Sequence, residues 1–198
     1  MRVLLWCVSF FLFLFAPCFG QSLVFGAKGG IPLTDAFADF KAMGVDTDVR
    51  SFSDSKDFVI GPFVELGLPF GFSVEADAFY RPLNLTVDQT TIPLGTFRTS
   101  TDITSWEFPI LAKYHFGHLP IVKPYVGAGP IFRAVRSGGS YLSNAGFSLA
   151  GGLEIKILRL RVLPEIRYSH WGSDAIARSS INYPSNKEQA EFLIGLGF

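Results

Sequence analysis

The sequence predicts an all-β fold: an eight-stranded, antiparallel, up-and-down transmembrane β-barrel. Beyond residue 20, no apolar run approaches the roughly 18 residues that a membrane-spanning helix needs. Segments with an apolar residue at every second position recur instead, and this period of two is typical of strands with two unlike environments. The last segment, residues 189–198, ends at the chain terminus. An apolar strand there needs a neighbour at each edge, and pairing with the first strand would close a barrel.

Residues 1–20 have the pattern of a secretory signal peptide. An arginine near the start is followed by an apolar run too short for a spanning helix, and small residues precede a cleavage position before Gln21. We therefore predict a signal peptide over 1–20 and one outer-membrane β-barrel domain over 21–198. Both cysteines, Cys7 and Cys18, fall in the first unit, so no disulfide or thiol chemistry is expected in the mature chain.

The first four alternating segments set large apolar residues against small or charged ones. Their apolar faces carry Leu23, Phe25, Ala27 and Ile31 in residues 23–31; Ile60, Pro62, Val64, Leu66 and Leu68 in 58–68; Phe72, Val74, Ala76, Ala78 and Tyr80 in 72–81; and Trp106, Phe108, Ile110, Ala112, Tyr114 and Phe116 in 106–116. Each segment is close to the 9–11 residues that a tilted strand needs to cross a membrane.

The last four segments repeat this alternation, although glycine and proline interrupt the first of them. Their apolar faces carry Val126, Ala128 and Phe132 in residues 123–135; Phe147, Leu149, Leu153, Ile155 and Ile157 in 147–157; Val162, Pro164, Ile166 and Tyr168 in 161–168; and Ala190, Phe192, Ile194, Leu196 and Phe198 in 189–198. A turn near residues 158–159 joins two of these segments and predicts a hairpin.

The connections between the eight segments alternate between long and short. The long ones are residues 34–56, 82–104, 137–146 and 172–187, and the short ones are 69–71, 117–121 and 158–159. Outer-membrane barrels have this asymmetry, with short turns toward the periplasm and longer loops outside. An even number of strands would place both termini at the short-turn rim.

The face opposite the apolar one is rich in glycine and carries equal numbers of acids and bases. The acids are Glu65, Glu75, Asp77, Glu107, Glu154, Glu165 and Glu191, and the bases are Lys28, Arg81, Lys113, Arg133, Lys156, Arg161 and Arg167. Buried charges have to be paired, so a neutral set indicates a packed polar interior. We predict that these side chains are structural interior charges.

Aromatic residues of the apolar face gather near the strand ends. Phe72, Phe116 and Phe198 fall at the short-turn rim, and Tyr80, Trp106, Phe147 and Tyr168 fall at the long-loop rim. Two such girdles are typical of a barrel in a bilayer. A secreted lipocalin-like binder is the alternative, because its apolar face would line a ligand cavity. Heat-modifiable gel mobility with membrane fractionation would separate the two.

Several short motifs resemble those of the bacterial outer-membrane β-barrel domain family, the small eight-stranded barrels of the OmpA-transmembrane-domain and OmpX type. They are the Lys-Gly-Gly in residues 23–31, Glu-Phe-Pro-Ile-Leu-Ala-Lys-Tyr at 107–114, Pro-Tyr-Val-Gly-Ala-Gly at 124–129, Pro-Glu-Ile-Arg-Tyr-Ser-His-Trp at 164–171, and terminal Phe198. The resemblance covers residues 22–198. It implies that Phe198 and the strand before it form the signal read by the barrel-assembly machinery.

Two histidine-containing motifs raise the question of an enzyme. Ser169 and His170, with Glu165 nearby, are the residue types of a lipid-modifying hydrolase of the outer membrane. Adjacent strand residues point to opposite faces, so this pair could not act as nucleophile and base. His115 and His118 flank a turn without a third ligand for zinc. We therefore predict no catalytic residues and no metal site.

Acidic and glycine-rich stretches are the remaining candidate sites. The first long connection carries Asp35, Asp39, Asp46, Asp48, Asp54 and Asp57. A calcium site needs about six oxygens in a tight spacing, and the Asp46-Thr-Asp48 pattern supplies too few. Gly127 and Gly129 lie within a strand and open no helix, so they are not a phosphate loop. No cofactor is expected.

The function predicted from these features is structural. The formal charge is zero, with 17 basic and 17 acidic residues, which gives no indication of a nucleic-acid partner. We expect a non-enzymatic barrel in the outer membrane of a Gram-negative bacterium, with a plugged polar interior and four outer loops whose ligand is unknown. Outer-membrane lipids and the assembly machinery are the expected partners. A narrow channel is the alternative, although eight strands leave room for little more than side chains.

Overall fold

The computed structural model describes residues 22–34, 40–43, 47–53, 58–91, 95–117, 121–137, 140–172 and 186–198. The elements are β1 (Leu23–Pro32), β2 (Phe40–Met43), β3 (Thr47–Ser53), β4 (Val59–Gly67), the 3-10 turn η1 (Pro69–Gly71), β5 (Phe72–Asp77), β6 (Phe79–Thr91), β7 (Gly95–His115), β8 (Val122–Ser137), β9 (Ser140–Ile157), β10 (Leu160–Trp171) and β11 (Glu188–Gly197). The predicted signal peptide lies outside the described residues.

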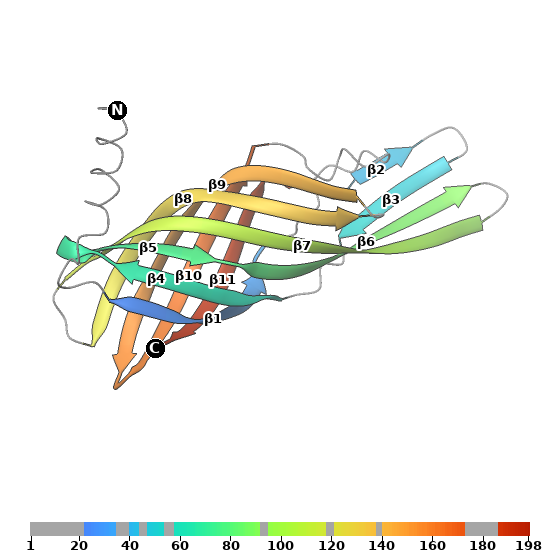
Figure 1. Ribbon diagram of the computed structural model, residues 1–198. Helices are drawn as coiled ribbons and strands as arrows, with labels where there is room; N and C mark the ends of the chain where they lie inside the picture. Colours follow the sequence, from blue (N-terminus) through green and yellow to red (C-terminus); the bar gives the residue numbers. More distant parts are fainter. Residues whose placement is uncertain are drawn as a thin grey trace, which may run out of the picture.

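The strands close into a barrel because β1 pairs on both of its edges (Figure 1). Lys28 lies opposite Gly195 of β11 on one side and opposite Gly61 of β4 on the other. All pairings are antiparallel, and β5 and β6 act as one barrel strand interrupted at Ala78, whose N–H donates to the Pro62 carbonyl at 3.0 Å. The predicted closed, eight-stranded, all-β barrel is confirmed.

Several strands continue well past the barrel, and here the sequence-based boundaries were wrong. Residues 82–104, expected to be a loop, are mostly a hairpin of β6 and β7, and residues 34–56 contain β2 and β3, which extend the same sheet. Of the expected loop 137–146, residue 137 belongs to β8 and residues 140–146 belong to β9, paired with β8. Figure 1 shows β2, β3, β6 and β7 projecting beyond one end. Backbone pairing needs no apolar face, and threonine-rich stretches suit strands, so polarity alone did not mark these ends.

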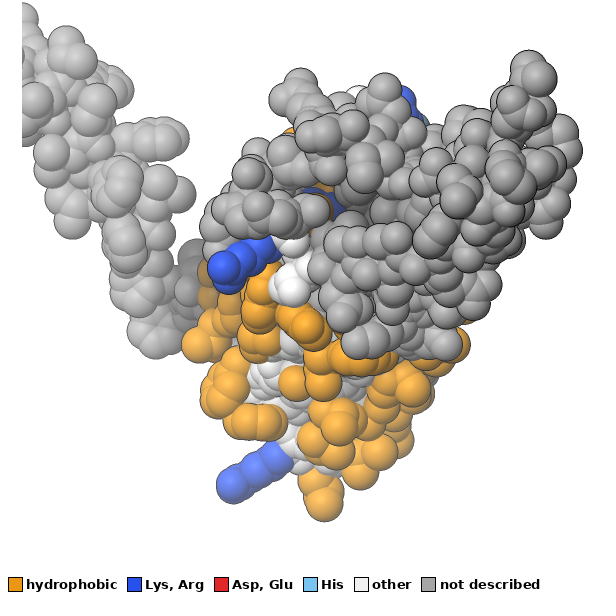
Figure 2. Space-filling view, turned by 90° about the vertical axis from the view of Figure 1, so that its right-hand side faces the viewer, with side chains coloured by type: hydrophobic (Ala, Val, Ile, Leu, Met, Phe, Trp, Pro, Cys, Tyr) orange, Lys and Arg blue, Asp and Glu red, His pale blue; other side chains and the backbone are white. Residues whose placement is uncertain are grey.

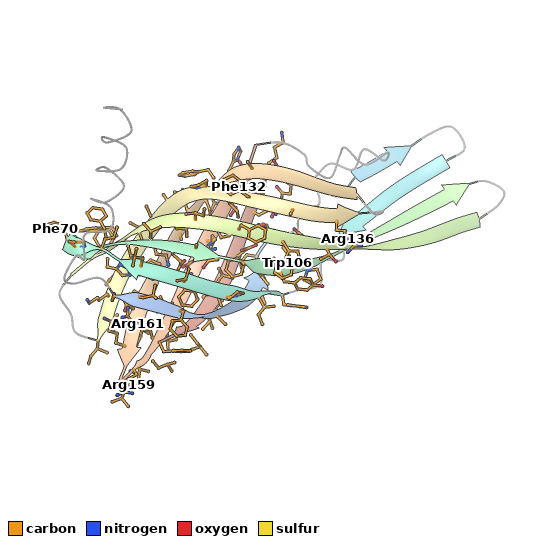
Figure 3. All side chains as sticks on the ribbon, viewed as in Figure 1. Phe70, Trp106, Phe132, Arg136, Arg159 and Arg161 are labelled. Carbon is orange, nitrogen blue, oxygen red and sulfur yellow. The ribbon has the colours of Figure 1, made fainter. Side chains whose placement is uncertain are left out.

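Two of the short connections, residues 69–71 and 158–159, form the turns that the sequence predicts, whereas residues 118–120 of the third lie outside the described residues. Phe70 in η1 has φ 64°, and Leu158 between β9 and β10 has φ 59°. Both are left-handed conformations that reverse the chain in very few residues. Figure 3 shows Phe70, Arg159 and Arg161 at this end of the barrel and Arg136 toward the other. Within the described residues, no helix is long and apolar enough to cross a membrane.

Large apolar side chains lie on the outside of the barrel. Exposed positions alternate along the strands, as with Ile60, Val64 and Leu66 in β4, and hydrophobic side chains cover the outward surface in Figure 2. Because the charged face points inward, the alternative of an apolar, lipocalin-like cavity is wrong. A surface of this kind is stable only against a similarly apolar medium.

Aromatic contacts lie at both ends of the outer surface. At the short-turn end, the ring of Tyr114 packs on Phe72 and Phe116, with centroids 5.0 and 4.9 Å apart. At the other end Tyr80 packs on Trp106 at 5.5 Å. The pairs of Tyr114 with Phe72 and of Tyr80 with Trp106 join neighbouring strands, and together these contacts match the two aromatic belts expected of a barrel in a bilayer.

Glycines permit close approach of strands, and the close approach at Gly129 supports a prediction about stability. A Cβ added to Gly129 of β8 would lie 2.0 Å from the Ile110 carbonyl oxygen of β7, whereas one added to Gly151 of β9 would meet nothing within 4 Å. Gly129→Ala is therefore expected to lower the free energy of unfolding by about 1–3 kcal/mol, the usual cost of overpacking. Gly151→Ala is the matched control. Equal urea midpoints for the two refolded variants would contradict this explanation.

Candidate functional site

The barrel interior brings together most of the charged residues that the sequence assigns to it. Alternate positions of the barrel strands place twelve of the fourteen in buried positions: Lys28, Glu65, Glu75, Asp77, Arg81, Glu107, Lys113, Arg133, Glu154, Glu165, Arg167 and Glu191. Lys156 and Arg161 differ, because their side chains remain 34% and 23% exposed. They lie at the short-turn mouth of the barrel, so the prediction of full burial was wrong for these two.

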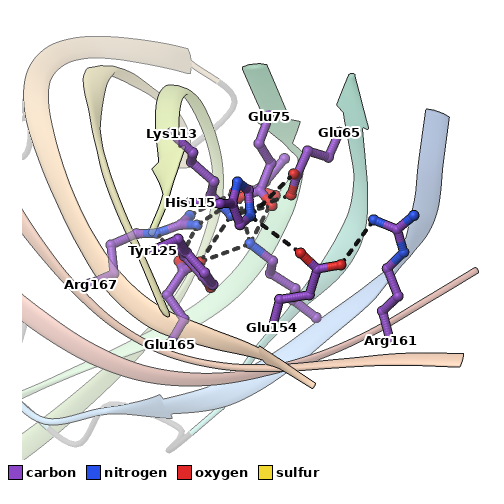
Figure 4. Close-up of polar contacts among 11 residues, drawn as sticks. Glu65, Glu75, Lys113, His115, Tyr125, Glu154, Arg161, Glu165 and Arg167 are labelled. Carbon is purple, nitrogen blue, oxygen red and sulfur yellow. Dashed lines mark hydrogen bonds and ion pairs between the residues drawn. The ribbon is translucent and has the colours of Figure 1, made fainter. Parts of the chain in front are cut away.

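Two lysines and two glutamates form the centre of the network (Figure 4). The ammonium of Lys28, from β1, lies 2.5 Å from Glu75 Oε1 and 3.1 Å from Glu165 Oε2. Lys113, from β7, lies 2.5 Å from Glu75 Oε2 and 3.3 Å from Glu165 Oε2. The two carboxylates come from β5 and β10. These four side chains therefore tie strands from all around the barrel across its axis.

Arg167 adds a third cation to this centre. Its guanidinium donates to Glu165 and lies 2.7 Å from an oxygen of Asp77. Tyr125, from β8, donates its hydroxyl hydrogen to Glu165 Oε2 at 2.8 Å. Glu165 therefore accepts hydrogen bonds from four residues. Such charge-assisted bonds are the strong ones when solvent is excluded.

A second cluster lies toward the long-loop end. Arg81 donates to Glu191 at 2.8 Å, and Arg133 donates to Glu107 through Nε at 3.1 Å and Nη2 at 2.8 Å. Gln189 joins the two arginines, because its Oε1 accepts from Arg81 at 3.0 Å and from Arg133 at 2.6 Å. The neutral amide thus joins two ion pairs that a longer contact, 3.6 Å between Arg81 Nη1 and Glu107 Oε1, also links.

Aromatic rings cover four of the buried cations. Lys28 lies 5.1 Å from the ring centroid of Phe63, and Lys113 lies 4.4 Å from that of Tyr125. Arg133 lies 3.7 Å from the ring centroid of Trp171, and Arg167 lies 5.1 Å from that of Phe79. Cation–π contacts are strongest where the cation has lost its water. The interior therefore holds its cations by both carboxylates and ring faces.

Sequence reasoning missed the roles of Tyr125, Trp171 and Gln189. Tyr125 and Gln189 were assigned to the inward face by alternation, but they carry no charge and so were left out of the interior set. Trp171 follows the last residue of the predicted segment 161–168 and lies in β10, buried beside Arg133. These residues could have been found from the sequence as inward-facing positions of the strands that carry an aromatic or a hydrogen-bonding side chain.

Ion pairs at the short-turn mouth form a third group. Glu154 Oε1 accepts from Arg161 at 3.0 Å and lies 3.4 Å from the ammonium of Lys156. Its other oxygen lies 3.5 Å from His115 Nε2, which is 3.7 Å from Glu65. Figure 4 shows Glu65, His115, Glu154 and Arg161 beside the central cluster. The buried set has seven acids and five bases, and Lys156 and Arg161 bring the bases to seven at the rim.

The structure brings together no hydrolase constellation at Ser169 and His170. Ser169 is buried, where its hydroxyl lies 3.2 Å from that of Ser148, whereas His170 is exposed on the opposite face. The prediction that the two face opposite ways is confirmed.

The metal-site candidates are only partly described. His118, Asp35, Asp39, Asp46, Asp54 and Asp57 lie outside the described residues, and Asp48 falls in β3. Among the residues that the structure describes, no group of three His, Cys, Asp or Glu side chains could hold a metal ion. Gly127 and Gly129 lie within β8, as predicted.

Comparison with known proteins places the fold. No protein-family description and no curated protein matches the sequence. Among solved structures, Neisserial surface protein A superposes with a TM-score of 0.53 and 17% identity, over 90% of this chain and 97% of that one. The outer-membrane protein OprG from Pseudomonas aeruginosa gives a TM-score of 0.53 and 17% identity, over 90% and 94%. The chain has the fold of the small outer-membrane barrels.

This outer-membrane-type barrel has a lumen filled by its own side chains in the described region. Beside the charges, Val24, Phe63 and Leu163 pack together with Tyr125, and Val59, Phe79 and Leu193 form a second buried apolar cluster. Eight strands leave an interior just wide enough for side chains. What the site can do is hold strands together through paired charges.

Proposed function

We propose that the protein is a non-enzymatic barrel of the Gram-negative outer membrane, secreted through a cleaved signal peptide, whose interior is a structural ion-pair network. The fold, the apolar outer surface and the two aromatic belts support a membrane location. The observation that carries the structural role is Glu165, which accepts from Lys28, Lys113, Tyr125 and Arg167, side chains of four different strands. The projecting hairpins and outer loops then meet the surroundings of the cell.

Planar-bilayer conductance of the refolded protein tests this role against a narrow channel. A structural network is expected to give no steady ion current, because the ion pairs occupy the lumen. Arg133→Met, which removes an interior cation, should lower stability rather than change ion selectivity. Steady currents in purified material, with selectivity altered by interior charge variants of unchanged stability, would establish the channel and overturn the structural role.

The terminal residue supports a prediction about assembly. Phe198 pairs with Phe25 of β1 through backbone hydrogen bonds of 3.1 and 3.2 Å, and the two rings pack edge to face at 4.5 Å. We propose that Phe198 is also read by the barrel-assembly machinery. Deleting Phe198 should lower the amount of folded barrel in cells far more than its yield on refolding in detergent. Equal amounts of truncated and full-length protein in cells would contradict this.

A further inference from the structure

The short-turn mouth of the barrel contains a pocket of about 120 Å³ that the interior network does not fill. The charged side chains in its wall are Glu65, His115, Lys123, Glu154, Lys156 and Arg161, from β4, β7, β8, β9 and β10. Apolar residues of the β4–β5 turn complete the wall on one side. The pocket is therefore a polar site at the edge of the apolar outer surface.

The inner part of the pocket offers polar groups that lack close partners. Glu65 is buried, yet its ion-pair contacts are long: 3.7 Å to His115 Nε2 and 3.8 Å to the ammonium of Lys113. Within the described part of the chain, the hydroxyl of Ser73, a residue only 2% exposed, and His115 Nε2 have no hydrogen-bond partner. Buried polar atoms are normally paired, so these three groups indicate a partner that occupies the pocket.

The outer part of the pocket has an excess of cations. Lys156 and Arg161 share a single oxygen of Glu154. Lys123, directly opposite Glu154 in the β8–β9 pairing, makes no ion pair within the described part of the chain. Three cationic side chains thus face one carboxylate. An anionic group with several oxygens would satisfy them, and phosphate is well suited to Lys and Arg donors.

We infer that this pocket binds a small aminophosphate zwitterion, the chemistry of an ethanolamine phospholipid headgroup. A primary ammonium has three donors and no acceptor, so it would fit the Glu65 carboxylate and the Ser73 hydroxyl, with the His115 ring beside it. The phosphate would lie among Lys123, Lys156 and Arg161. A simple anion would leave the inner acceptors unpaired, and a simple cation would leave the outer charges unpaired. The lipid as source rests on the proposed membrane location, whereas the site chemistry does not.

Titration of the refolded protein in maltoside micelles, followed by the NMR signals of the His115 ring, tests the site. O-phosphoethanolamine should shift these signals in a saturable way. Phosphocholine should bind at least about tenfold more weakly, because its methylated ammonium has no N–H with which to donate a charge-assisted hydrogen bond. Equal binding of the two compounds, or no saturable shift with the first, would overturn the inference.

Variants at the mouth separate binding from folding. Glu65→Gln removes the inner acceptor charge, and Lys123→Ala removes a partly exposed outer cation without disturbing the central network. Both should weaken O-phosphoethanolamine binding by about tenfold. Arg159→Ala is the matched control, because Arg159 is exposed at the neighbouring turn and does not line the pocket. Unchanged affinity in Lys123→Ala, with the protein folded, would overturn the assignment of the phosphate side.

Short-chain phosphatidylethanolamine added to the same micelles distinguishes the two sources of the ligand. If the lipid headgroup is the ligand, it should compete with O-phosphoethanolamine for the His115 signals, and phosphatidylcholine of equal chain length should not. If the lipid fails to compete while the soluble compound binds, the pocket takes a free aminophosphate, and the lipid source is overturned. Both arms use the purified barrel, so they do not depend on its location in the cell.

Discussion

Replacing Glu165 by alanine is expected to lower the free energy of unfolding by about 3–5 kcal/mol, the cost of breaking a buried ion pair from one side. The change leaves three buried cations, those of Lys28, Lys113 and Arg167, with fewer carboxylates around them, and removes the acceptor of the Tyr125 hydroxyl. Urea unfolding of the refolded barrel in detergent, followed by gel mobility and circular dichroism, measures the loss.

Arg161→Ala is the control for this prediction. Alternation along β10 puts Arg161 in the same inward set as Glu165, and the sequence alone predicts the same large cost. The structure leaves the Arg161 side chain 23% exposed, with one carboxylate partner that Lys156 also contacts. A partly solvated pair of this kind contributes about 0–1 kcal/mol. Equal losses in the free energy of unfolding for Glu165→Ala and Arg161→Ala would contradict the distinction between the buried central network and the partly exposed ion pairs at the mouth.

Arg133→Met is expected to lower the free energy of unfolding by a similar amount, about 3–5 kcal/mol. Glu107 would lose both hydrogen bonds from Arg133 and keep only Arg81, at 3.6 Å. Gln189 would lose its 2.6 Å donor, and the ring of Trp171 would lose the guanidinium stacked on it at 3.7 Å. The methionine keeps much of the side-chain length, so the loss measures the missing charge more than a cavity.

Trp171 gives this second variant a local readout. In a Trp106→Phe background, purified as residues 21–198 without Trp6, the fluorescence of the barrel reports on Trp171. Arg133→Met should shift its emission and lower the urea midpoint together. Arg159→Met, at an exposed turn, should change neither. A shifted emission with an unchanged midpoint would show that Arg133 contributes contact but no stability.

The barrel itself was predictable because a strand in two environments has an unavoidable period of two. Ile60, Val64 and Leu66 face outward and Glu65 faces inward, and this alternation alone separated the two faces. Equal numbers of acids and bases then indicated which face is enclosed. Burial next to lipid on one face and next to paired charge on the other leaves few residue types acceptable at each position.

Strand ends and network partners were less predictable, each for a physical reason. The β6–β7 hairpin continues through sequence rich in threonine and other polar residues, where the alternation of Leu83, Leu85 and Val87 is too short and too diluted to mark a strand end. Gln189 carries no charge, so a count of acids and bases does not find it, although it links two arginines. Exposure of Lys156 and Arg161 depends on where the barrel mouth falls along β9 and β10, which alternation does not specify.

Closure of β1 on β11 has a consequence for how the protein can come apart. Lys28 reaches Glu165 across 137 positions of sequence, and its strand, which pairs with β4 on one edge, gains its partner on the other edge only when the final strand has arrived. Contacts of such long range form late and together. A barrel that lacked one β-strand would leave buried ammonium and carboxylate groups without counterions. Single strands therefore cannot be lost one after another. The barrel should therefore unfold cooperatively, in a single step, without a stable form that lacks one strand.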